Sequence, residues 1–425
     1  MPVPGGFDSH TLPPAYFLLE VGVSGPGPLA GVAVLELSQT VAAAYCGRLL
    51  ASLGAQVVKV EPPEGDPLRR QGPFPDDIPD PEASALFVHL HRGKRSVTLR
   101  PQTATGRSLL EGLIGRSQVL VHDLPPPQAT ALGLDPASLR QRHPRLVAAA
   151  ISYFGADGPY AHYRGSELVV EAVSGYMSIT GDPQREPLKV YGHLAHYQAG
   201  LQAAVAVLAA LLEGEASGQG EVADVSMAEA TTFLMGGPPL LAQLLGLVLR
   251  RNGNRLIGLG DRHPYPSTLR PCGDGWVHAH VNYRYPELLA ALLEDPWLAS
   301  PQVLGAMSAC ADDIDARLDR WLADKSRREA TQLAQEMRLP FTEVLDPAEV
   351  LADSYGHHAS RGNFLTVRHP TRGDMLVVAS PLKSADLPDD LGPPPLLGQH
   401  NREVLGEWLG LSPQEVVQLR SADII

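Results

Sequence analysis

The sequence is poor in cysteine and in basic charge. Its three cysteines, Cys46, Cys272 and Cys310, are odd in number, lie far apart and form no CxxC pair. This spacing suits neither a disulfide framework nor a cysteine metal site, and it is typical of reduced cytosolic thiols. Lysine and arginine number 34 against 47 acidic residues, which gives a net charge of −13. We therefore expect no binding to nucleic acid or to an acidic membrane face.

Long apolar runs are also scarce. Met1–His10 has no basic region followed by an apolar core, so no signal peptide is expected. The longest uncharged stretches, Tyr197–Leu212 and Phe233–Leu249, are short for a membrane span, and the second is interrupted by Gly236-Gly237-Pro238-Pro239. The sequence predicts a soluble, cytoplasmic protein without a membrane partner.

Short apolar strands alternate with helices along the first third of the chain. A strand is predicted at Val32–Leu37, a helix at Val41–Leu53 and a second strand at Gln56–Val60, a spacing that a parallel crossover allows. The connecting Ser38-Gln39-Thr40 lacks the GxGxxG pattern, so a dinucleotide fold is not indicated. The alternation continues to a strand at Arg145–Ser152 and predicts an α/β fold with helices on both faces of a sheet. Ligands of such sheets bind at the carboxyl ends of the strands.

The densest set of candidate acid and base groups lies in Ile151–Leu212. Its members are Asp157, His162, Arg164, Glu167, Glu171, His193 and His196. Ser166 is expected to cap a helix at Glu167–Val173, with Glu167 in the first turn, where a carboxylate is favoured. His196 precedes the Ala-rich and Leu-rich run Tyr197–Leu212, which indicates a buried helix. A polar group at the start of a buried helix suits either chemistry or a simple cap.

Several co-linear motifs resemble the family III CoA-transferase superfamily (CaiB/BaiF type), which includes formyl-CoA transferase, carnitine CoA-transferase and α-methylacyl-CoA racemase. The resemblance is strong over Pro28–Met227, weaker over Pro340–Leu405 and faint between them. The matching segments are SLGAQVVKVEPPEGDPLRR (Ser52–Arg70), RGKRSVTL (Arg92–Leu99), LGLDPASLRQRHPRLVAAAISYFGADGP (Leu132–Pro159), AALLEGEASGQGEVADVSM (Ala209–Met227) and LLGQHNREVL (Leu396–Leu405).

The resemblance implies a large doubly wound, Rossmann-like domain and a smaller middle α+β domain. On this basis residues 1–27 are an N-terminal extension, 28–228 and 335–425 form the large domain, and 229–334 form the small domain. It also implies an interlocked homodimer and an acyl-CoA substrate, with a free carboxylic acid as a possible second substrate. CoA is then a substrate, and neither a bound cofactor nor a metal is expected.

The chain departs from the family at the catalytic position. The transferases carry a nucleophilic aspartate at the start of the helix that here precedes Ala209-Ala210-Leu211, and counting back places His196 there, with His193 as the alternative. No acidic residue stands between Glu186 and Glu213. Glu167 matches the acid that many members carry before the next segment. The racemases have a His-Asp pair at Ser166-Glu167 and an aspartate where this chain has His196.

These residues leave three functions open. CoA transfer needs a carboxylate that attacks the thioester, and an acyl-imidazole leaves none to carry CoA, so His196 is a poor direct substitute and Glu167 is the alternative. Racemisation, isomerisation or elimination needs a proton-transfer pair, which Glu167 and His196 could form. A CoA-binding member without catalysis is the third interpretation. Without the resemblance, Glu167 is equally a helix cap, and the histidines are more often structural.

The resemblance also implies CoA contacts outside the catalytic pair. Lys94 and Arg95 would otherwise be a solvated charge pair, but they suit CoA phosphates. Arg164 falls where formyl-CoA transferases carry a CoA-contacting lysine. The other expected contacts are Val41 and Ala42 on the loop that approaches the thioester, Leu99 after the third strand, and Asp123 and Leu124, which replace a usual Asn-Phe pair.

Overall fold

The computed structural model describes residues 25–255, 265–281, 287–388 and 390–425. These residues form two compact units. The first comprises the described parts of Met1–Tyr176, Val190–Leu240 and Gly356–Ile425, and the second comprises those of Met177–Lys189 and Leu241–Tyr355. Most of the predicted N-terminal extension, 1–27, lies outside the described residues.

The first unit is built on a six-stranded parallel sheet with the order β3-β2-β1-β4-β5-β6. This order is that of a doubly wound sheet, and the mixed α/β prediction is confirmed. Glu36 on β1 is in register with Lys59 on β2, which is in register with Ser96 on β3. The strands are β1 (Ala33–Leu37), β2 (Gln56–Glu61), β3 (Lys94–Thr98), β4 (Val119–His122), β5 (Val147–Ser152) and β6 (Val222–Ser226).

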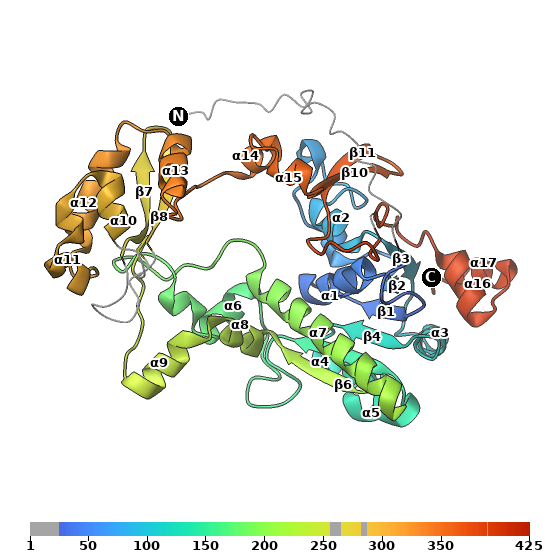
Figure 1. Cartoon of the computed structure of the whole chain (residues 1–425). Coiled ribbons are helices and arrows are strands. Elements are labelled where there is room, and N and C mark those ends of the chain that lie inside the picture. Colours follow the sequence, from blue (N-terminus) through green and yellow to red (C-terminus); the bar gives the residue numbers. More distant parts are fainter. Residues whose placement is uncertain (1–24, 256–264, 282–286, 389) are drawn as a thin grey trace. The chain divides into compact units, whose positions relative to one another are not determined.

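Helices cover both faces of this sheet (Figure 1). Val34 and Val57 pack into one apolar core with α1 and α7, whereas Leu35 and Val58, their neighbours in sequence, pack into another with α3 and α16. This alternation follows from the two-residue period of a strand. The helices of the first unit are α1 (Val41–Ser52), α2 (Ala85–His91), α3 (Ala104–Ile114), α4 (Pro126–Ala131), α5 (Pro136–Arg142), α6 (Glu167–Val173), α7 (Leu194–Ser217), α8 (Met227–Met235), α15 (His357–Ser360), α16 (Asn401–Leu409) and α17 (Pro413–Ser421).

Helix α7 is longer than the sequence predicted. It begins at Leu194, so His196 lies inside its first turn, and it ends at Gly218, which adopts the left-handed conformation. By length and composition α7 could cross a membrane. In this fold one face of α7 packs against α1 and β5.

Gly200 allows α7 to approach α1 closely. A Cβ at this position would lie 2.5 Å from the carbonyl oxygen of Ala42 and 3.3 Å from the Cβ of Tyr45. We expect Gly200→Ala to lower the free energy of unfolding by about 1–3 kcal/mol, because the overpacking outweighs the better helix propensity of alanine. The matched control is Gly406→Ala in α16, where the nearest atom would be 3.6 Å away. Equal urea midpoints for the two variants would contradict this packing.

The second unit contains an antiparallel sheet and its own apolar core. Strand β7 (Ser267–Cys272) pairs antiparallel with β8 (Gly275–His280), and β9 (Thr342–Glu343) joins β8. Helices α12 (Ala311–Leu322) and α13 (Arg327–Glu336) are separated by a short break that contains Lys325. The remaining helices are α10 (Glu287–Leu293), α11 (Pro301–Gly305) and α14 (Pro347–Ala352), and α9 (Gly237–Leu245) spans the boundary between the units.

The division into units differs from the predicted domain boundaries in three places, and one of them is residues 229–240, which were expected in the small domain but group with the first unit. Residues 335–355 were expected in the large domain, but β9 pairs with β8 and Arg327 of α13 forms an ion pair with Glu349 of α14. Residues 177–189 also group with the second unit. Both segments join the second unit through contacts that local sequence patterns do not reveal.

Candidate active site

The carboxyl ends of β1 and β4 are tied together by Asp123. This residue follows β4, and its carboxylate accepts hydrogen bonds from the backbone N–H of Gln39 at 2.6 Å, the N–H of Thr40 at 3.0 Å and the Thr40 hydroxyl at 2.6 Å. Burial raises the pKa of Asp123 to about 6, although these hydrogen bonds oppose the shift. Asp123 therefore fixes the loop that leads into α1 and positions the buried Val41 and Ala42.

Glu167 meets the first turn of α7. Ser166 caps α6 by accepting a hydrogen bond from the N–H of Val169, and the predicted helix Glu167–Val173 is confirmed. The Glu167 carboxylate accepts hydrogen bonds from the N–H of Ala195 at 2.7 Å and of His196 at 3.4 Å. His196 Nδ1 also donates to it. The two residues are only 8% and 6% exposed, so this is a buried carboxylate–imidazole pair.

The hydrogen bonds decide the ionisation of Glu167. Burial raises its pKa, but the hydrogen bonds from His196 and Ala195 outweigh burial, and the pKa lies below its normal value. Because α7 also directs its positive N-terminal end toward this group, the ionised carboxylate is stabilised. The site therefore holds a negative charge next to an imidazole.

His193 joins the pair at the N-cap of α7. Its ring centroid is 5.8 Å from that of His196, and the ring is half-buried. One ligand-type atom from each of Glu167, His193 and His196 lies within 4.8 Å of the others. Within the described ranges, this is the one group of three such side chains close enough to hold a metal ion.

Tyr153 is a neighbour that sequence reasoning missed. Its ring lies edge-on to His196, with 5.9 Å between the centroids. A Cβ on Gly165 would lie 2.2 Å from the Tyr153 ring, so the glycine makes room for it. Burial raises the pKa of Tyr153, and the charges of Asp123 and Glu167 add to this shift. Its position, immediately after β5 at the carboxyl edge of the sheet, was the available signal.

Lys94 is not exposed to a ligand. Its ammonium is buried, donates to Glu36 at 2.6 Å and to the carbonyl oxygen of Ala44 at 2.8 Å, and lies 3.2 Å from His91 Nδ1. Burial lowers its pKa to about 8 despite the attraction of Glu36. Lys94 therefore serves an internal ion pair and not the phosphate contact that the sequence predicted.

The other predicted CoA contacts are dispersed. Arg95 forms surface ion pairs with Glu403 and Glu407 of α16, both at 3.0 Å. Leu99 and Leu124 are buried in the core between the sheet and α3, and Arg164 is exposed. Strands β1 and β2 separate β3, which carries Lys94 and Arg95, from β4. The structure thus brings Glu167, His193 and His196 together but does not gather the predicted basic groups around them.

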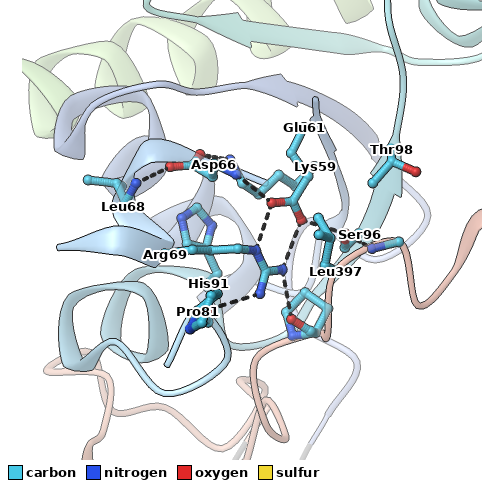
Figure 2. A network of polar contacts seen from close by, with 12 residues as sticks. Lys59, Glu61, Asp66, Leu68, Arg69, Pro81, His91, Ser96, Thr98 and Leu397 are labelled. Atoms are coloured by element: carbon cyan, nitrogen blue, oxygen red, sulfur yellow. Dashed lines mark hydrogen bonds and ion pairs between the residues drawn. The ribbon is translucent and has the colours of Figure 1, made fainter. Parts of the chain in front are cut away.

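The motif Ser52–Arg70 forms a buried polar network (Figure 2). Lys59 bonds to Asp66, and Arg69 donates to both oxygens of Glu61 at 2.8 and 2.9 Å. Arg69 also reaches the carbonyl oxygen of Pro395 at 3.1 Å, from the C-terminal segment. These four charged side chains are at most 1% exposed. The motif therefore stabilises the fold, and the candidate reactive groups lie at α6 and α7.

Comparison with known proteins gives one consistent result. Residues 29–401 match the family described as CoA-transferase family III. The chain is 32% identical to a formyl-CoA:oxalate CoA-transferase of Streptomyces avermitilis, covering 93% of this chain and 99% of that protein. It is 30% identical to a succinyl-CoA–D-citramalate CoA-transferase of Chloroflexus aurantiacus, covering 94% and 98%. A solved CaiB/BaiF family protein from Brucella suis superposes with a TM-score of 0.76 at 27% identity, covering 90% of this chain and 99% of that chain.

Proposed function

The chain belongs to CoA-transferase family III, and from this premise we propose that it transfers CoA between a CoA thioester and a carboxylic acid, with the Glu167 carboxylate as nucleophile. Named relatives act on formyl-CoA with oxalate and on succinyl-CoA with D-citramalate. An acyl-CoA and a free acid are accordingly the proposed substrates. CoA enters as part of a substrate.

One observation carries the proposal. The Glu167 carboxylate lies against the first turn of α7, bonded to the N–H and the ring of His196. By the resemblance, His196 occupies the position of the family's nucleophilic aspartate. The longer glutamate side chain from α6 therefore supplies a carboxylate next to the position where the family places one.

CoA transfer requires a carboxylate that is first acylated to an anhydride, then converted to a CoA thioester, and finally released as a carboxylate again. Glu167 attacks the thioester carbonyl, the C–S bond breaks, and a mixed anhydride and a CoA thiolate form. The thiolate attacks the glutamyl carbonyl, which releases the first acid and leaves CoA on Glu167. A second acid reverses these two steps and takes the CoA. Backbone N–H groups at the start of α7 can stabilise the negative oxygens that develop.

The hydrogen bond between His196 and Glu167 also favours a second function, in which the imidazole is the reactive group. A carboxylate that accepts the Nδ1 proton orients the ring and leaves Nε2 to act as a base, as in hydrolase triads. His196 could then remove the α-proton of an acyl-CoA, giving racemisation, isomerisation or elimination. A CoA-binding protein without catalysis remains the third alternative.

The pH dependence of the rate separates the first two functions. Glu167 has a lowered pKa, so it stays ionised at every pH above the normal glutamate value of about 4.3. We therefore expect kcat/KM for CoA transfer to stay nearly constant as the pH falls from about 8 to about 5.5. A reaction that uses a neutral histidine as base loses rate as the pH falls, because the imidazole becomes protonated. A tenfold loss of kcat/KM per pH unit within this range would contradict the carboxylate mechanism.

We also propose that the chain forms the interlocked homodimer of its family. Several large apolar side chains on α7 and α8 of the first unit are exposed, and exposed apolar surface of this kind marks an interaction site. They include Leu201, Val205, Leu212, Phe233 and Leu234. Light scattering after size exclusion should give twice the mass of one chain. A monomer at micromolar concentration would contradict the proposal.

A further inference from the structure

We propose that Glu167, His193 and His196 bind a single divalent transition-metal ion, with Zn²⁺ as the first candidate. The sequence spacing predicted no metal site, because the ligands come from two segments and not from one local motif. The fold brings the start of α6 to the start of α7, and the three side chains meet there.

The distances are close to those of a metal site. The three ligand-type atoms lie within 4.8 Å of one another. Zinc bonds to imidazole nitrogen and carboxylate oxygen are about 2.0–2.2 Å long, so ligand atoms in a tetrahedral site are roughly 3.3–3.6 Å apart. Small side-chain rotations would bring the three ligand atoms to these separations.

The donor types select the metal. Two imidazoles and one carboxylate form the ligand set of several catalytic zinc sites, which keep a fourth position open for water or substrate. The same set binds other first-row ions, whereas magnesium and calcium prefer oxygen ligands. The site therefore suits Zn²⁺, Co²⁺ or Fe²⁺ and discriminates against Mg²⁺.

Contacts around the three ligands favour a bound cation, whereas the helix dipole of α7 opposes it. In the described part of the chain, the only ion pair of the Glu167 carboxylate is with His196. The N–H of Ala195 holds one carboxylate oxygen, and Tyr153 packs against the His196 ring, so two of the three ligands are already fixed. The positive end of α7 opposes the ion. On binding, the ion replaces the hydrogen bond between His196 Nδ1 and Glu167, and the imidazole carries its proton on Nε2.

Metal binding and the proposed function involve the same carboxylate. A Glu167 that ligates a metal cannot attack a thioester, so Zn²⁺ should inhibit CoA transfer in proportion to its occupancy. This consequence rests on the proposed function, but the binding itself does not. Binding is measured without any acyl-CoA, and the two proposals can therefore fail separately.

The test uses full-length, tag-free protein treated with a chelator. Titration calorimetry with ZnCl₂ and elemental analysis after dialysis should give one Zn²⁺ per chain, and a tenfold excess of Mg²⁺ should not displace it. We expect His193→Ala and His196→Ala each to weaken binding at least tenfold. His162→Ala is the matched control, because His162 is exposed and lies outside the cluster. Its affinity should equal that of the unmodified protein.

Circular dichroism shows whether each variant folds. If His196→Ala, at a buried position, does not fold, His193→Ala still provides the test, because His193 is a half-buried helix cap. Absence of Zn²⁺ binding by the folded, unmodified protein overturns the inference. Unchanged affinity in folded His193→Ala also overturns it. CoA transfer without metal binding would leave the proposed function standing, whereas metal binding without any acyl-CoA chemistry would remove the proposed function alone.

Discussion

Glu167→Gln lowers kcat for CoA transfer by about 10⁴–10⁶-fold, because a neutral amide cannot attack the thioester. The substitution keeps the size of the side chain. Its carbonyl oxygen can still accept the hydrogen bond from the N–H of Ala195, so α6 and α7 should stay together. Steady-state assays with an acyl-CoA and a free acid measure the effect, and the thermal midpoint measures the stability.

The matched control is Glu229→Gln. Glu229 also lies in the first turn of a helix, α8, but it is exposed. This variant should keep the kcat of the unmodified protein within a factor of two. If Glu167→Gln retained half of the activity while folded, Glu167 would not be the nucleophile, and another carboxylate would have to be sought.

Arg69→Ala lowers the free energy of unfolding by about 3–5 kcal/mol, because it leaves the buried carboxylate of Glu61 without its partner. Arg69 is 1% exposed and makes two hydrogen bonds to Glu61, one to Glu82 at 2.6 Å and one to the carbonyl oxygen of Pro395. The guanidinium also lies 3.8 Å from the centre of the Phe87 ring. One substitution therefore removes contacts to four residues in three separate segments of the chain.

Arg70→Ala is the neighbouring control. Arg70 is exposed and donates only to the backbone carbonyl of Glu64 in the described structure, so its loss should change the free energy by no more than about 0.5 kcal/mol. Urea unfolding of both variants gives the comparison. Similar midpoints for Arg69→Ala and Arg70→Ala would show that the buried network in Figure 2 does not stabilise the fold.

Sequence patterns predicted the strands, helices and caps that depend on residues close together in the chain. The alternation of apolar strands and helices from Val32 onward gave the parallel sheet, and Ser166 marked the start of α6 correctly. In each case the decisive residues lie within one or two turns of each other, so their periodicity is visible in the sequence.

The contacts that define the site are not local. His196 and Glu167 are 29 residues apart, and Lys94 and Glu36 are 58 apart. Lys94 is typical of a surface residue by composition, yet the register of β3 against β2 turns it into the core beside Glu36. Tyr153 lies in the matching segment Leu132–Pro159, but its place beside His196 depends on Gly165 lying against its ring, which the segment does not reveal. Pairings of this kind come from tertiary packing, which overrides local preference.

Isotope exchange together with adduct detection tests whether Glu167 is the nucleophile in CoA transfer. The protein is incubated in heavy water with a panel of acyl-CoAs and free acids, and mass spectrometry follows new thioesters, deuterium at the α-carbon and CoA attached to the peptide that contains Glu167. If Glu167 is the nucleophile, new thioesters form without deuterium and a CoA adduct forms on Glu167. Both are absent from Glu167→Gln. Deuterium at the α-carbon without new thioesters would contradict CoA transfer and would establish His196 and Glu167 as a proton-transfer pair.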